Sequence, residues 1–224
     1  MEMIVVSIGT LSQNPFWQEN SPVRTPHATT CLVRQNDRVI LVDPSLPAQA
    51  LEARIAERAG IKAVAVTDVF LTNWRPAHRR ALKAFSQAAW WMLEREIQAA
   101  GEVLEQAATH APANSEELAM IQDEQRLLSR VQAAPDKFTQ GVGIFPLPGY
   151  TPGQCGLLLE LPASTVVIAG DAVATAAHFT SGRVLSGCFD LEQAQESLME
   201  LYNLADLIVP GHDNVFVNPR TAGF

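Results

Sequence analysis

Short apolar runs typical of β-strands occur in the first and last thirds of this 224-residue chain, on either side of a helical middle. Leu32 to Arg34 and Val39 to Val42 flank a polar turn, which predicts a hairpin with a short loop. The other predicted strands span residues 64–71, 89–93, 144–147, 156–161, 165–169 and 207–209. Strands that recur in both halves, with helices between them, indicate an α/β fold of layered sheets with helices outside.

Amphipathic segments predict where the helices lie. Ala48 to Ala59 carries leucine and isoleucine at helical spacing and is followed by Gly60, a common C-terminal stop. Two more helices are expected at 78–85 and, with Asp190 as N-cap, at 191–204. Residues 94–108 and a segment capped by Asn114 predict a helical hairpin, an insertion of about 94–134 within one domain that spans 1–224.

Charge and cysteine content narrow the classes of partner. Sixteen basic against 24 acidic residues give a net charge of −8, which repels polyphosphate and anionic lipid, so neither nucleic acid nor a membrane is expected. Cys31, Cys155 and Cys188 form no C-x-x-C pair, and residues 1–14 lack the pattern of a secretory signal. These features favour a reduced, cytoplasmic setting.

Three potential metal ligands follow predicted strands. His78 lies in the loop after the strand 64–71, Asp171 follows 165–169, and His212 follows 207–209. Loops converge beyond the carboxyl ends of strands in α/β sheets, so two imidazoles and a carboxylate could meet there. That donor set suits zinc or iron and leaves a coordination position for water or substrate. The alternative is three surface or hydrogen-bonded residues that happen to follow strands.

The segment 69–78, with sequence VFLTNWRPAH, resembles the T-H-x-H-x-D-H signature of the metallo-β-lactamase superfamily with several substitutions. Residues 39–44 are similar to the family's early strand-plus-Asp motif, and 147–154 to its H-T-P-G-H segment. Residues 168–171 resemble the G-D motif and 209–212 the terminal P-G-H motif. Five motifs in the family's order, between residues 39 and 212, imply its αββα sandwich.

The resemblance implies that the family's first metal site has been lost here. Its positions are occupied by Asn73, Arg75, Gln154 and Asp171, so two amides and a guanidinium replace three imidazoles. None of these three groups is a good ligand for zinc, and the arginine adds a fixed positive charge. Arg75 is therefore expected to stand in for the missing cation, either by neutralising Asp171 or by clamping a substrate carboxylate or phosphate.

The second metal site is better preserved, with Ala77, His78, Asp171 and His212 at its four positions. Three of the four ligands remain, which implies one divalent metal, zinc as first choice, with iron or manganese as alternatives. Repulsion from Arg75 could also have abolished metal binding. Asp43 is expected to hold a ligand-bearing loop by hydrogen bonds.

The implied activity is hydrolysis of a small ester, lactone or thioester, with Arg75 and Asp171 as catalytic residues. Asn73, Gln154, Asp43 and His178 are expected to contact the substrate or support the ligands. A small-molecule substrate is the expected partner, with an anionic one as an option, and a homo-oligomer is left open. One alternative is a metal-free descendant that binds a small anion or a protein without turnover. Oxidation by a single iron ranks lower, because the family's persulfide dioxygenases place iron in the first site.

Overall fold

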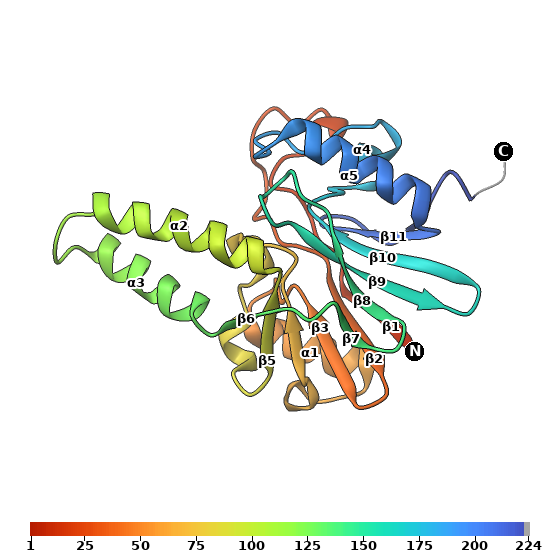
Figure 1. The fold of residues 1–224 in the computed structure, drawn as a ribbon, viewed down its shortest axis with the longest axis horizontal. Coiled ribbons are helices and arrows are strands. Elements are labelled where there is room, and N and C mark those ends of the chain that lie inside the picture. The colour runs from red at the N-terminus through yellow and green to blue at the C-terminus, as the bar shows by residue number, and fades with distance from the viewer. Residues whose placement is uncertain (222–224) are drawn as a thin grey trace.

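The computed structural model describes residues 1–221, in which two six-stranded mixed sheets pack face to face (Figure 1). The first sheet runs in chain order through β1 (Glu2–Ser7), β2 (Thr30–Gln35), β3 (Arg38–Val42), β4 (Asp68–Phe70), β5 (Ala89–Met92) and β6 (Val131–Ala133). The second runs in reverse order through β12 (Phe216–Val217), β11 (Leu207–Pro210), β10 (Ser164–Gly170), β9 (Cys155–Leu161), β8 (Val142–Pro146) and β7 (Lys137–Thr139). The end of the expected 1–224 domain, residues 222–224, lies outside the described residues.

Helices cover the outer faces of both sheets. The α-helices are α1 (Ala48–Ala59), α2 (Glu94–His110), α3 (Glu116–Leu128), α4 (Ala176–Thr180) and α5 (Leu191–Leu204). Four short 3-10 turns join the larger elements: η1 (Pro15–Trp17), η2 (Ala63–Ala65), η3 (Pro76–His78) and η4 (Leu82–Phe85). Among residues 1–221, no helix has the length and apolarity needed to cross a bilayer.

The strands alternate apolar side chains between an inner and an outer layer. In the β2–β3 hairpin, Val33 and Ile40 point to the core between the sheets, whereas Leu32 and Leu41 point to the layer under α1. On the other side, α5 packs Leu198 and Leu201 against the second sheet. This arrangement is the predicted αββα sandwich, and every strand of the predicted set is present at or near its expected place.

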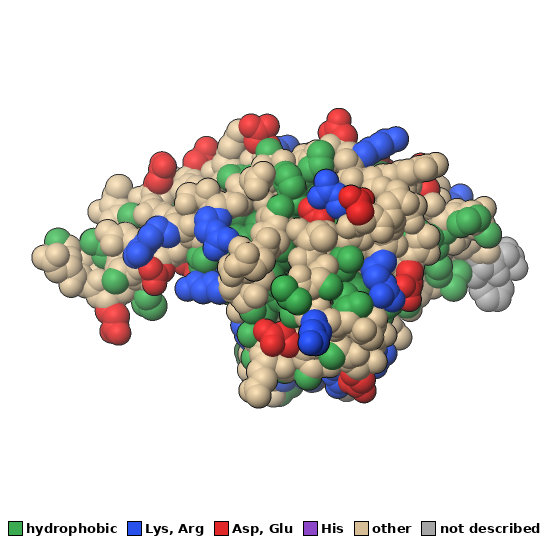
Figure 2. Space-filling view, turned by 90° about the horizontal axis from the view of Figure 1, so that it is seen from below, with side chains coloured by type: hydrophobic (Ala, Val, Ile, Leu, Met, Phe, Trp, Pro, Cys, Tyr) green, Lys and Arg blue, Asp and Glu red, His purple; other side chains and the backbone are tan. Residues whose placement is uncertain are grey.

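The helical hairpin α2–α3 projects from one side of the sandwich as an arm (Figure 1). Its second helix begins one residue later than predicted, because the Ser115 hydroxyl, and not the Asn114 side chain, accepts the Leu118 amide. Asn114 instead adopts a left-handed backbone with φ of 60°. Seen from below, basic and acidic side chains intermingle over the arm and the body (Figure 2), so this face offers no continuous basic surface.

Two sequence predictions next to the site are wrong in detail. The strand expected at 64–71 begins only at Asp68, because 63–65 forms a 3-10 turn in which Val64 is exposed. The helix expected at 78–85 is two separate 3-10 turns. Pro76 starts the first turn, which ends with the His78 side chain fully buried, and an α-helix starting at His78 would not give this local geometry.

Candidate metal centre

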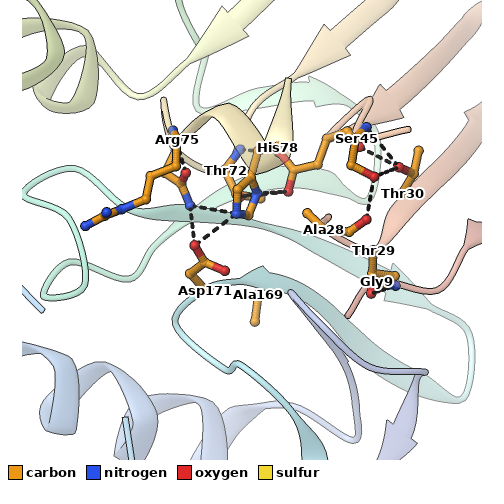
Figure 3. A network of polar contacts seen from close by, with 12 residues as sticks. Gly9, Ala28, Thr29, Thr30, Ser45, Thr72, Arg75, His78, Ala169 and Asp171 are labelled. Carbon is orange, nitrogen blue, oxygen red and sulfur yellow. Dashed lines mark hydrogen bonds and ion pairs between the residues drawn. The ribbon is translucent and has the colours of Figure 1, made fainter. Parts of the chain in front are cut away.

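His78, Asp171 and His212 converge between the two sheets, each from the loop at the end of a strand. Figure 3 shows His78 and Asp171 side by side. His78 Nε2 lies 2.9 Å from Asp171 Oδ2, and His212 Nε2 lies 2.9 Å from Asp171 Oδ1. One potential ligand atom from each residue lies within 4.8 Å of the other two, and all three side chains are buried. The surroundings of each ring decide whether these atoms fit a metal.

Asp43 fixes the orientation of His78. Its Oδ2 lies 2.9 Å from His78 Nδ1, and its two oxygens also accept the amide and hydroxyl of Thr72 at 2.9 and 2.8 Å. A carboxylate on Nδ1 places the proton of a neutral imidazole there and leaves the Nε2 lone pair facing Asp171. Asp43 holds this position with a left-handed φ of 51°, a strained conformation that Asp and Asn tolerate better than most residues.

Backbone carbonyls fix the orientation of His212. Its Nδ1 lies 3.1 Å from the Thr10 carbonyl and 3.0 Å from the His27 carbonyl, so Nδ1 must be the donor. The Nε2 lone pair of the neutral ring then faces Asp171. His27 thus reaches the site through its backbone, while its ring nitrogen Nε2 contacts the Ile8 carbonyl.

The donor set fits a divalent metal. Although His212 Nε2 is close to Asp171 Oδ1, the two are not aligned as a hydrogen bond, and within residues 1–221 this buried oxygen accepts none. Two imidazoles that both present Nε2 lone pairs to one carboxylate, with each Nδ1 held by an acceptor, match the donor chemistry of a zinc or iron site. A cation at this point would also satisfy this carboxylate oxygen, which accepts no hydrogen bond within residues 1–221.

Without a metal, the same groups form a charged cluster. Burial alone would lower the pKa of His78, but the charges of Asp171 and Asp43 outweigh it and raise this pKa to about 10. For Asp171, burial alone would raise the pKa, yet His78 and His212 hold it well below its usual range. The metal-free site is therefore an imidazolium between carboxylates.

Amides fill the space where the family's first metal site would lie. Asn73 Nδ2 donates to Gln154 Oε1 at 2.9 Å and to Asp171 Oδ2 at 3.2 Å, and Gln154 Nε2 donates to the Ala169 carbonyl at 3.1 Å. Both amides are fully buried. Gly170 is required beside them, because a Cβ there would lie 2.8 Å from Gln154 Nε2 and the backbone φ is +54°. Asn73 thus satisfies Gln154 Oε1 and contacts Asp171 Oδ2 without a second ion.

Arg75 does not neutralise Asp171. Its side chain is exposed and extends away from the His78–Asp171 pair (Figure 3), and its guanidinium lies over the Tyr150 ring at 4.6 Å. Burying a guanidinium beside the cluster would cost its hydration, and the imidazoles already supply positive charge. The prediction that Arg75 neutralises Asp171 is therefore wrong. The prediction that Arg75 binds an anionic group of the substrate remains a prediction.

Glu96 is a functional candidate that the sequence analysis missed. This buried carboxylate on α2 accepts the Trp74 amide at 3.1 Å, the Gly153 amide at 3.0 Å and the Thr151 hydroxyl at 2.7 Å. It thereby ties the base of the arm to the two loops that carry Asn73 and Gln154. The available signal was an acidic residue on the apolar stripe of an amphipathic helix, four residues before Ala100.

His178 and Ala77 lie at the edge of the cluster. His178 is buried in α4, where its Nδ1 lies 2.8 Å from the Thr175 hydroxyl and its ring packs edge-on against Phe16. Burial, with the nearby charges of His212 and Arg183, lowers its pKa. Ala77 offers only its carbonyl, which accepts the Ala28 amide. Neither side chain contacts Asp171.

These features define an αββα-sandwich protein with a candidate single-metal centre between its sheets. A family model described as the metallo-beta-lactamase superfamily matches residues 24–212, so the chain belongs to the metallo-β-lactamase superfamily. The resemblance seen in the sequence motifs is thereby confirmed. A search of curated proteins found no match to this sequence.

Solved structures share the fold at low identity. A Thermotoga maritima protein assigned to the metallo-β-lactamases is 18% identical, with a TM-score of 0.70 over 96% of this chain and 98% of its own. The dizinc quorum-quenching lactonase AidC is 21% identical, with a TM-score of 0.59 over 79% and 67%. An N-acyl homoserine lactone hydrolase with its product at the catalytic metal centre is 20% identical, with a TM-score of 0.61 over 90% and 86%. At these identities the likeness establishes the fold alone.

Proposed function

We propose that this protein is a hydrolase with one divalent metal, held by His78, Asp171 and His212, that acts on a small ester, lactone or thioester. The observation that carries the proposal is the orientation of both rings, which present Nε2 to one carboxylate while each Nδ1 is held by an acceptor. Two proteins of similar fold, AidC and the N-acyl homoserine lactone hydrolase, support the substrate class.

The bound metal would supply a Lewis acid that polarises a carbonyl and lowers the pKa of a coordinated water. The chain's own residues position the reaction. Asp43 keeps the proton of His78 on Nδ1, and Asn73 donates to Asp171 Oδ2, which limits how that carboxylate can rotate. Burial and the charge of Asp171 raise the pKa of Tyr150 to about 12, although Arg75 acts to lower it. The Tyr150 hydroxyl therefore stays protonated near neutral pH. Tyr150 is thus available as a hydrogen-bond donor.

A second candidate is a metal-free protein that binds a small anion or a partner without turnover. Its support is the His78 ring, which has a carboxylate 2.9 Å from each nitrogen and so forms a stable ion pair without a metal. Asp171 Oδ1 counts against it: within residues 1–221 this atom accepts no hydrogen bond although His212 Nε2 lies 2.9 Å away, and a finished metal-free cluster would satisfy it.

Elemental analysis of the protein purified without chelator separates the two candidates. We expect about one equivalent of zinc, iron or manganese in the wild type and in the His110→Ala control, whose histidine is exposed at the end of α2, and a loss of metal in His212→Ala. Hydrolysis of an ester, a γ-lactone and a thioester would then be followed with and without that metal. Absence of metal from all three proteins would overturn the hydrolase proposal.

A further inference from the structure

A groove of about 710 Å³ opens at the loop that follows Asn73. One wall is the first half of α2, and the other is formed by the loops at 74–76, 150–152 and 187–189. Its volume is in the range of small-molecule sites, and its lining residues Trp74 and Arg75 directly follow Asn73, whose amide donates to Asp171. The ligands themselves do not line it, so whatever occupies the groove is recognised by a different set of side chains.

One end of the groove is cationic. Arg75 and Arg95 both line it and are exposed, and within residues 1–221 neither guanidinium lies at ion-pair distance from a carboxylate. Arg79, by contrast, is paired with Glu124. Two unpaired arginines at one groove are notable in a chain of net charge −8. The N-terminus of the 17-residue α2 adds partial positive charge at the same end.

The carboxylate of Glu96 does not cancel this charge, although it also lines the groove. It is 3% exposed, and two backbone amides and the Thr151 hydroxyl occupy its oxygens. Its charge is therefore directed into the loops. An anion that enters the groove would meet Arg75 and Arg95 first.

The other end of the groove is apolar. Val103, which lines it beside Ala99 and Ala100, is 65% exposed, an unusual value for such a side chain. Val103 follows Arg95 by eight residues, which along an α-helix is about 12 Å. Glu102 lies at this apolar end and would repel an anionic group there. The groove thus has a direction, from a cationic end to an apolar end.

We propose that this groove binds a medium-chain carboxylate, with its head group at Arg75 and Arg95 and its alkyl chain running along α2 toward Val103. At about 1.3 Å per carbon in an extended chain, 12 Å corresponds to about nine carbons. Turnover of an acyl substrate of this kind rests on the proposed hydrolase function, whereas its binding can be measured without a metal.

Isothermal titration calorimetry of the full chain with octanoate, and with octan-1-ol as the uncharged match, tests the proposal. We expect octanoate to bind more tightly than octan-1-ol, and Arg95→Gln to weaken octanoate binding about tenfold. Arg58→Gln removes an exposed arginine from α1 and should leave binding unchanged. Val103→Glu should weaken binding, while Met120→Glu, at an equally exposed position on α3, should not.

The outcomes separate this inference from the proposed function. Equal binding of octanoate and octan-1-ol, an unchanged dissociation constant in Arg95→Gln, or no binding at all would each overturn it. So would loss of octanoate binding after EDTA treatment, since the carboxylate would then sit on the metal. Octanoate binding by a protein shown to hold no metal would support the proposed carboxylate site in the groove and refute the proposed hydrolase function.

Discussion

Replacing Asp43 with Asn tests whether this residue sets the proton position of His78. Asn tolerates the left-handed backbone at this position, so the change alters hydrogen bonding and charge with little added strain. The carboxylate accepts three hydrogen bonds, from the Thr72 amide, the Thr72 hydroxyl and His78 Nδ1. An amide has only one oxygen, and if that oxygen stays on the Thr72 amide, its NH₂ group faces His78 Nδ1. The ring must then move its proton to Nε2, the atom that faces Asp171.

The expected loss follows from this mismatch. An unsatisfied buried donor costs about 1–3 kcal/mol of unfolding free energy. Loss of a carboxylate that orients a metal-bound imidazole lowers metal affinity by about 10- to 100-fold, or about 1.4–2.7 kcal/mol. Zinc affinity would be measured by competition with a chromophoric chelator, and stability by urea denaturation of the metal-free protein.

Asp68→Asn provides a matched control. Asp68 is equally buried and accepts from Arg38, Trp91 and Thr67, but it lies at the start of β4, away from the metal centre. This control should lose stability by a similar amount and keep the zinc affinity of the wild type. A zinc affinity of Asp43→Asn within about twofold of wild type, together with the stability loss seen in Asp68→Asn, would refute the reasoning.

Three further predictions concern the same loops. In the metal-free protein the raised pKa of His78 contributes stability that is fully present below the unfolded-state pKa near 6.5 and is lost as the pH rises toward about 10. The unfolding free energy from urea denaturation should therefore fall with pH in that window, by at most about 1.4 kcal/mol per pH unit. An unfolding free energy that does not change with pH there would argue against the imidazolium. Glu96→Gln places an NH₂ donor against one of the two backbone amides and should lower the unfolding free energy by about 2 kcal/mol, whereas Glu94→Gln, at an exposed position, should change it by less than about 0.5 kcal/mol. Restoring imidazoles in an Asn73→His, Gln154→His double variant should raise the metal content measured by elemental analysis, and an unchanged content would show that more than these ligands was lost.

The sequence predicted the fold well, because its information is local and repeated. Alternating strands and five ordered motifs each point to the same sandwich, and α1 and α5 have the predicted bounds and α5 the predicted cap. The sequence analysis gave no bounds for β1, and it did not predict β6, β7 and β12, since segments of two or three residues carry no periodicity. The 3-10 turns around His78 were read as a helix for the same reason.

The site was predictable only where a side chain is short and its backbone fixed. His78, Asp171 and His212 follow strands that aim them, so their convergence follows from topology. Arg75 has a long side chain on an exposed turn, and alignment with a motif position does not reveal which way such a chain extends. The role of Glu96 depends on two amides from distant loops, a contact that no local pattern encodes.

Because the carboxylate of Glu96 joins α2 to both loops of the lost first site, the width of the groove and the shape of the metal pocket are mechanically linked. A change that shifts the first turn of α2 would pull on Trp74 and Gly153, the neighbours of Asn73 and Gln154. Directed evolution of ligand preference should therefore begin beyond this tether, from Ala99 onward, where the helix can be redesigned without disturbing the inner chemistry.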